Sequence, residues 1–203
     1  MNNEATIALF LRHVYAGRNN ITYSLEELEK IIEGCKMKKR SSQENLYKLL
    51  SGKLYGVCLR YSKDEHEAKD YMQDVFLKIF DKIDTYMDKG SFEGWAKRLT
   101  VNHILSTLRK NADSNFVEID ERHGDVDNTD DNIDDIEINK LLKLIQELPP
   151  KYRTVFNMYV IEEYSHQEIA DELGISSGTS KSNLHRAKAI LKNAVEEYRK
   201  YNK

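Results

Sequence analysis

The chain has 203 residues, of which 40% are hydrophobic and 32% charged, and its formal net charge is −3 at pH 7. These proportions are typical of a folded globular protein and exclude an intrinsically disordered chain. No apolar run approaches the roughly 18 residues that a membrane span requires, so we expect no membrane anchor and no signal peptide. Cys35 and Cys58 lie within helical patterns and are expected to be reduced packing residues, in keeping with a cytoplasmic protein.

The small net charge conceals an uneven distribution. Residues 1–113 carry +3, residues 114–137 carry −9 and residues 138–203 carry +3. Two mildly basic blocks therefore flank an acidic connector, and the average does not exclude a nucleic-acid partner.

The first block shows helical periodicity throughout and no convincing strand. We expect helices at about 25–37, 43–61, 65–83 and 92–110. The apolar stripe of helix 43–61 is predicted to be Leu46, Leu50, Leu54, Val57 and Tyr61, and that of helix 65–83 to be Ala68, Tyr71, Met72, Val75, Phe76, Ile79, Phe80 and Ile83. Ser24 and Glu27 have capping-box spacing, Ser62 and Glu65 repeat that spacing, and Ser91 can cap the last helix. That helix is predicted to bury one apolar stripe, formed by Phe92, Trp95, Leu99, Ile104, Leu105 and Leu108.

Residues 113–137 show almost no periodicity and are predicted to be a flexible acidic linker. The segment that starts at Asp125 lacks the Gly and Glu of a calcium loop, so we predict no metal there. The second block begins with a helix near Ile136, whose apolar residues are Ile138, Leu141, Leu142 and Ile145. Pro149 and Pro150 end that helix, and the next is expected at about 150–162. Ser165 and Glu168 again have capping-box spacing.

Residues 166–191 have the spacing of a helix-turn-helix. Gly174 follows a short helix at a point where the chain must reverse, and a positive φ helps there. Ser176 can cap the second helix. The inward faces of the two helices are predicted to be formed by Ile169, Ala170 and Leu173 in the first, and by Leu184, Ala187, Ile190 and Leu191 in the second.

The start of the second helix is rich in small hydroxyl residues, which are poor helix formers but allow close approach to a phosphate. Lys181, His185 and Arg186 lie on one side of this helix, and Arg186 can pair with a guanine edge or a phosphate. This favours a DNA-recognition helix. An ordinary helical hairpin with a polar outer face is the alternative, and Ser180 favours it, because an apolar residue usually occupies that position.

Two further surfaces allow two interpretations each. In helix 65–83, polar side chains surround Leu77, which indicates either a solvated face or a protein-docking surface with one apolar anchor. Helix 92–110 carries a basic face, and Tyr86 and Met87 precede it. That arrangement suits single-stranded bases, or is again a solvated face.

No Gly-rich phosphate loop, nucleophile elbow or Cys/His cluster occurs in the sequence. We therefore predict no catalytic residues, no metal site and no cofactor, and an enzyme is not expected.

Three motifs, in this order, resemble the extracytoplasmic-function (ECF) class of bacterial sigma-70 family RNA polymerase sigma factors. They are KLYGVCLRYSKDEHEAKDYMQDVFLKIFDKI (53–83), GSFEGWAKRLTVNHILSTLRK (90–110) and LPPKYRTVFNMYVIEEYSHQEIADELGISSGTSKSNLHRAKAIL (148–191). The resemblance extends over roughly residues 25 to 195.

The resemblance implies an all-α protein with two small helical domains. Residues 25–113 would be region 2, which binds the polymerase clamp and the minus-ten element, and residues 138–203 would be region 4, which reads the minus-thirty-five element. The acidic linker, 114–137, would lie in the polymerase's channel for nucleic acid. The implied function is a promoter-specificity subunit that binds core RNA polymerase (clamp and flap) and promoter DNA. An anti-sigma factor or other targeting partner is also expected.

The resemblance and the two basic faces together assign candidate residues. Polymerase binding is expected at Asp70, Gln73, Asp74, Leu77 and Lys78. DNA binding is expected in the first block at Tyr86, Met87, Lys89, Ser91, Lys97, Arg98, Asn102, Arg109 and Lys110, and in the second at Ser177, Thr179, Lys181, Ser182, His185 and Arg186.

The chain departs from the family pattern at two positions and lies outside it in one segment. Ser180 and Asn183 stand where apolar and basic residues are expected, which predicts soft recognition of the minus-thirty-five element. Residues 1–24 are an N-terminal extension, either a partner-binding amphipathic helix or a start-site extension. A stand-alone helix-turn-helix regulator and a scaffold that binds no DNA are the alternatives to a sigma factor.

Overall fold

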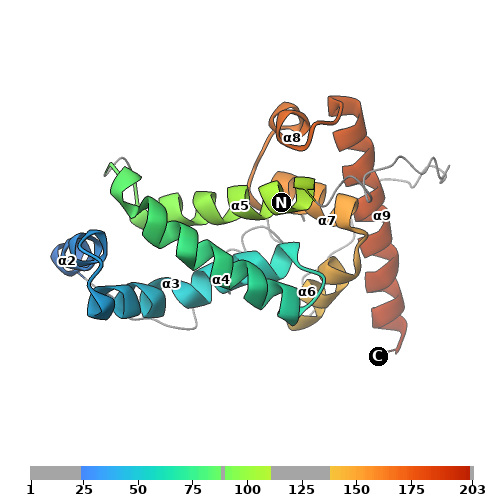
Figure 1. Cartoon of the computed structure of the whole chain (residues 1–203). Coiled ribbons are helices and arrows are strands. Elements are labelled where there is room, and N and C mark those ends of the chain that lie inside the picture. Colours follow the sequence, from blue (N-terminus) through green and yellow to red (C-terminus); the bar gives the residue numbers. More distant parts are fainter. Residues whose placement is uncertain (1–23, 88–89, 111–137, 202–203) are drawn as a thin grey trace. The chain divides into compact units, whose positions relative to one another are not determined.

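The computed structural model describes residues 24–87, 90–110 and 138–201, and every element within these ranges is helical (Figure 1). None of the described helices combines the length and the apolar character needed to cross a membrane. The described helices divide into two compact units, one formed by α2 to α5 as far as Ser106 and one by α6 to α9. The predicted acidic linker and residues 1–23 of the predicted extension lie outside the described residues.

The first unit contains four α-helices and a short 3-10 turn. Their bounds are Leu25–Lys36 (α2), Arg40–Tyr61 (α3), Glu65–Lys82 (α4), Ile83–Thr85 (η1) and Phe92–Lys110 (α5). The four predicted helices are confirmed, although α3 begins three residues earlier than expected.

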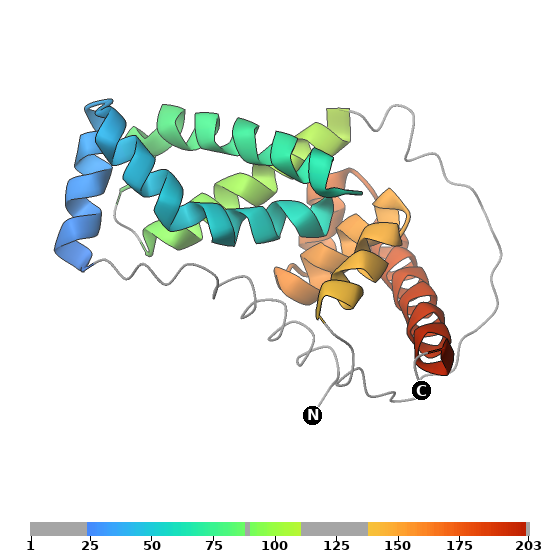
Figure 2. The same ribbon diagram turned by 90° about the horizontal axis from the view of Figure 1, so that it is seen from below.

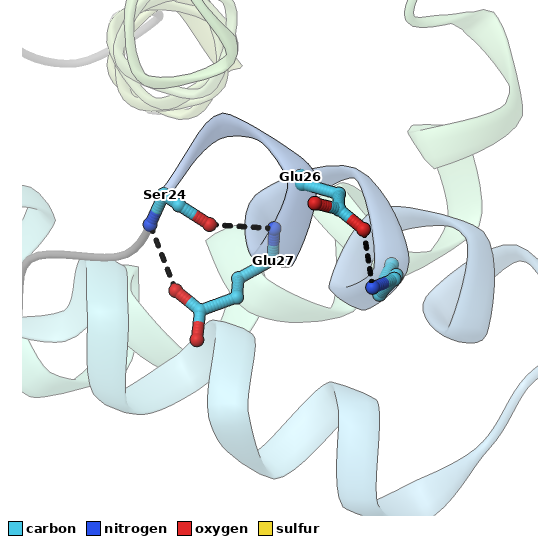
Figure 3. Close-up of polar contacts among 4 residues, drawn as sticks. Ser24, Glu26 and Glu27 are labelled. Atoms are coloured by element: carbon cyan, nitrogen blue, oxygen red, sulfur yellow. Dashed lines mark hydrogen bonds and ion pairs between the residues drawn. The ribbon is translucent and has the colours of Figure 1, made fainter.

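The capping box predicted at the start of α2 is confirmed (Figure 3). The Ser24 hydroxyl accepts a hydrogen bond from the Glu27 amide at 3.2 Å, and the Ser24 amide donates to the Glu27 carboxylate at 2.8 Å. This reciprocal pair satisfies two backbone donors that a helix start otherwise leaves without partners. The pKa of Glu27 is lowered by the hydrogen bonds from Ser24, so the carboxylate form that closes the box is favoured.

Helices α3 and α4 lie side by side in both views and supply most of the core of this unit (Figures 1 and 2). The apolar stripe predicted on α3 is buried; its members are Leu46, Leu50, Leu54, Val57 and Tyr61. On α4, Phe80 is half-buried, whereas the other predicted stripe residues are buried. Periodicity therefore predicted the inward face of both helices correctly.

Two expectations for this unit were wrong. Asp64, not Ser62, caps α4: its side chain accepts from the Glu67 amide at 2.8 Å, whereas Ser62 is buried at the end of α3 and donates to the Leu59 carbonyl. On α5, Phe92, Ile104 and Leu105 are buried as predicted, but Trp95, Leu99 and Leu108 are half-buried. The face turned inward is rotated from the predicted one, and it includes Ala96, Thr100, Val101 and His103.

The second unit contains α6 (Ile138–Glu147), α7 (Pro150–Phe156), η2 (Asn157–Ile161), α8 (His166–Leu173) and α9 (Ser177–Tyr201). The helix predicted at 150–162 is correct in extent, but its second half is a π turn, in which the Glu162 amide bonds to the Asn157 carbonyl. The long helix α9, drawn in red, packs against α6, α7 and α8 (Figure 1).

The core of the second unit lies along α9. The residues predicted to face inward on α6, α8 and α9 are mostly buried, including Leu141, Leu142, Ile145, Ile169, Ala170, Leu184, Ala187 and Leu191. Ile190 was expected among them but is 39% exposed, and Leu173 is half-buried. Arg153 is buried and donates to the carbonyls of Gln146 and Leu148, which satisfies the end of α6.

Candidate nucleic-acid interface

The turn between α8 and α9 has the predicted helix-turn-helix geometry. Gly174 ends α8 in the left-handed conformation, with φ of 67°, which glycine adopts without steric cost. The Ser176 hydroxyl then accepts from the Thr179 amide at 2.9 Å and so caps α9. The capping box of Ser165 and Glu168 at the start of α8 is also present.

The first turns of α9 present the predicted contact residues to solvent in part. Lys181, Ser182 and His185 are exposed, whereas Ser177 and Thr179 are half-buried. The Thr179 hydroxyl lies 2.8 Å from the Ser176 hydroxyl, and the Ser182 hydroxyl donates to the Thr179 carbonyl at 3.0 Å. One side of the helix therefore carries a cation, a hydroxyl and an imidazole that a duplex can reach.

Arg186 is placed differently from the other predicted contacts. Its side chain is half-buried and donates to the Tyr152 hydroxyl of α7 at 3.3 Å. The guanidinium therefore joins α9 to α7, an internal role that sequence reasoning missed.

The two unusual positions of α9 both point inward. Ser180 is fully buried and Asn183 is 6% exposed. The Ser180 hydroxyl lies 2.9 Å from Nδ1 of His166, the first residue of α8. In the sequence, the only sign of this contact was a serine at a position of α9 where an apolar residue is expected, 14 residues after a histidine.

In the first unit, the described part of the loop before α5 rests on an aromatic cluster. The ring of Tyr86 lies 5.0 Å from Phe92, edge-on, and 5.7 Å from Trp95. The Tyr86 hydroxyl also donates to the Gly90 carbonyl at 2.8 Å. Sequence analysis assigned Trp95 to the core, whereas the structure places it half-buried beside Tyr86.

The remaining loop residues are placed as follows. Met87 is 70% exposed, and Ser91 is exposed and accepts from the Gly94 amide at 3.0 Å, which confirms the predicted cap. Lys89 lies outside the described residues.

The basic face of α5 is only partly available. Arg98, Asn102, Arg109 and Lys110 are exposed, but Lys97 is half-buried and lies 3.2 Å from the Glu93 carboxylate. Glu93 also pairs with Lys53 of α3. Burial acts to raise the pKa of Glu93, but the two lysines outweigh it and hold the pKa below its ordinary value. Glu93 thus joins α5 to α3, and Lys97 is held by the same carboxylate within α5.

The five residues predicted to bind polymerase are all exposed on α4. Leu77 is 70% exposed and is the one apolar side chain among the five. Asp74 lies 3.6 Å from Nε2 of the buried His103 of α5, and Asp70 lies 3.3 Å from His66. The α4 face, formed by Asp70, Gln73, Asp74, Leu77 and Lys78, therefore combines acidic groups with one apolar anchor.

Neither Cys35 nor Cys58 is a reactive thiol at neutral pH. Burial raises the pKa of Cys35 to about 11 and that of Cys58 to about 12, so both stay protonated thiols at neutral pH. No group of histidine, cysteine and acidic residues in the described part of the chain could hold a metal ion.

Comparison with known families matches each unit separately. Residues 46–113 match the family model described as sigma-70 region 2, and residues 138–191 match sigma-70, region 4. The two matches together cover more than half of the chain and occur in the expected order. The chain belongs to the sigma-70 family.

Similar proteins place this sigma factor in the ECF class. It is 28% identical over 162 residues to the ECF RNA polymerase sigma factor SigE of Mycolicibacterium smegmatis. The aligned residues cover 77% of this chain and 63% of SigE. It is 25% identical over 182 residues to ECF sigma factor SigW of Bacillus subtilis, covering 84% and 97%. Sigma factors of this family are transcription initiation factors and not enzymes.

A solved structure is also similar. The sigma factor RpoE of Bartonella quintana, crystallised with the anti-sigma factor NepR, aligns with a TM-score of 0.43 and 19% identity, over 84% of this chain and 95% of that one.

Proposed function

We propose that this sigma factor is a promoter-specificity subunit that binds core RNA polymerase, recognises and helps to open promoter DNA, and directs transcription initiation. The observation that carries the proposal is that the two sigma-70 matches fall on separate helical units, each with its own exposed face. We assign region 2 to residues 25–113, the linker to 114–137 and region 4 to 138–203, and expect the protein to act in the cytoplasm.

The α4 face is the proposed contact with the polymerase clamp. Burying an exposed leucine contributes about 1.5–3 kcal/mol, enough for Leu77 to anchor the interface. The surrounding charges then give the contact its orientation, because rim charges act on specificity more than on affinity.

The aromatic cluster is the proposed support for an extruded base of the minus-ten element. Flipping a base costs a few kcal/mol of stacking and pairing, which the protein must replace. Tyr86 and Trp95 lie beside the loop that carries Met87 and Ser91, and Arg98 and Asn102 are exposed on the helix that follows. Stacking surface, cations and an amide are the groups that bind single-stranded bases.

The exposed side of α9 is the proposed reader of the minus-thirty-five element. Lys181, Ser182 and His185 lie in the first turns of the recognition helix, the part that contacts base edges and phosphates in helix-turn-helix proteins. The acidic linker, with its charge of −9, suits a basic channel built for nucleic acid. An anti-sigma factor or another targeting partner is the proposed regulator.

The decisive experiment is transcription with core polymerase in the presence and absence of this chain. A promoter fragment is first selected from a pool of random-sequence DNA by the reconstituted holoenzyme and is then used for run-off transcription. We expect initiation only when the chain is added. A stand-alone regulator would bind DNA without polymerase and leave initiation by core enzyme unchanged.

A matched pair of variants tests the α4 face. Leu77→Asp places a charge on the proposed clamp contact, and Leu25→Asp makes the same change at an 81% exposed leucine on α2. We expect Leu77→Asp to abolish co-purification with core polymerase and Leu25→Asp to preserve it. Equal retention by both variants would contradict the assignment of the α4 face.

A further inference from the structure

The helix-turn-helix contains a polar group where its two helices meet. Ser180, the fourth residue of α9, is fully buried, and Leu184 and Ala187 continue the same inward face. A buried hydroxyl costs stability unless it has a hydrogen-bond partner. Whether Ser180 destabilises this interface therefore depends on whether its hydroxyl has a hydrogen-bond partner.

The partner comes from the start of α8. Nδ1 of His166 lies 2.9 Å from the Ser180 hydroxyl, which is hydrogen-bond distance. The hydroxyl donates when Nδ1 carries no proton and accepts when Nδ1 is protonated, so either neutral tautomer can form the bond. His166 directly follows the capping residue Ser165, so its backbone is held by the capping box. The bond thus joins the start of α8 to the first turn of α9.

His166 is also held from a third element. Its ring stacks on Tyr159 of the π turn, with centroids 4.5 Å apart and planes at 20°. The Lys188 ammonium of α9 lies over the Tyr159 ring, 6.0 Å from its centroid. We call these four residues, Tyr159, His166, Ser180 and Lys188, the His166 cluster.

The buried member of the His166 cluster, Ser180, is next in sequence to the exposed residues of α9. Lys181 and Ser182, the next two residues after Ser180, are exposed, and His185 follows about one turn later. Apolar packing holds the two helices together, and a hydrogen bond adds a restriction on both distance and angle. Restraining Ser180 therefore restrains the rotation of α9, and with it the direction of its outward side chains.

We propose that His166 is a positioning residue that acts through Ser180 to orient the recognition helix toward promoter DNA. This inference rests on the proposed function of α9. It also gives the departure at Ser180 a reason: the serine is half of a matched pair, and recognition depends on both members.

The test is a double-mutant cycle in the reconstituted holoenzyme. His166→Ala, Ser180→Ala and the double variant are compared for binding to the selected promoter fragment. They are also compared for binding to a forked fragment that contains the minus-ten element but lacks the minus-thirty-five element. We expect each single variant to weaken binding to the full promoter about tenfold, because each removes the hydrogen bond that restrains α9. The double variant should be no weaker than the single variants, and binding to the fork should be unchanged.

A conservative variant separates positioning from simple loss of folding. The amide of His166→Asn can occupy the place of Nδ1, so this variant should recover most of the binding that His166→Ala loses. Failure of Asn to rescue, additive effects in the double variant, or equal losses on the fork would each overturn the proposal. If wild-type holoenzyme binds neither fragment, the proposed function itself has failed.

Discussion

The Arg186 guanidinium donates a hydrogen bond to the Tyr152 hydroxyl, 3.3 Å away, and so joins α9, the proposed recognition helix, to α7. Tyr152 is 8% exposed, and Lys151 lies 5.1 Å from its ring centroid. The residue most readily assigned to a guanine edge from the sequence is thus also part of the packing of the second unit. Substitutions of Arg186 will therefore combine effects on stability and on DNA binding.

Tyr152→Phe separates those two effects. It removes the hydroxyl but keeps the ring, and we expect the free energy of unfolding to fall by about 1 kcal/mol. Denaturant unfolding of the full chain measures this change. Tyr47→Phe, at a 48% exposed tyrosine, is the matched control and should change little. A stability for Tyr152→Phe equal to that of the control would show that the bond contributes nothing.

Lys181→Ala should weaken holoenzyme binding to the selected promoter and reduce the slope of log affinity against log salt by about 1, because one phosphate contact is lost. Lys143→Ala is the control, since Lys143 is exposed on α6 and is not among the proposed DNA contacts at the start of α9. Filter binding at several salt concentrations measures both slopes. An unchanged slope for Lys181→Ala would remove this residue from the proposed interface.

The pKa of His166 is lowered by burial and then by the charges of Lys181 and Lys188. Because the folded state then binds fewer protons than the unfolded state, the stability of the protein should fall as pH decreases through the range below about 6.5, and it should recover as pH rises. NMR titration of His166 should give a pKa below that value, and Lys181→Ala should raise it. A titration at or above the ordinary value would contradict the structure.

Substitution of glycine by alanine should have opposite effects on stability at Gly34 and at Gly52. A Cβ atom at Gly34 would lie 2.0 Å from the Ser42 hydroxyl, so Gly34→Ala should force α2 away from α3 and cost about 1–3 kcal/mol. A Cβ atom at Gly52, within α3, would meet nothing within 4 Å, so Gly52→Ala should stabilise the protein by about 0.5–1 kcal/mol. Thermal unfolding compares them, and the pair Gly34→Ala with Ser42→Gly should recover much of the loss.

The end of α9 extends beyond the region 4 match, which stops at residue 191. Val195 is buried, and the Lys140 ammonium of α6 lies 5.2 Å from the Tyr198 centroid. Val195→Ala should therefore lower the free energy of unfolding by about 1–2 kcal/mol, whereas Asn193→Ala, at an exposed position, should be nearly neutral. If both variants unfold alike, the extension contributes no packing to this unit.

The amino-acid sequence by itself determined the helices and most of their limits. Local interactions between residues one to four positions apart can be recognised from the sequence. They include the capping boxes at Ser24 and Ser165, the reversal at Gly174 and the inward face of α3. The three motifs likewise indicated the family that the comparisons later matched.

Tertiary structure decided which side chains meet across helices. The pairs His166 with Ser180, Arg186 with Tyr152 and Glu93 with Lys53 join separate elements, and no local pattern predicts them. The rotation of α5, which buries His103 and leaves Trp95 beside Tyr86, has the same origin. How far a helix turns toward its neighbour depends on the packing of all the side chains between them, and that information is distributed over the whole unit.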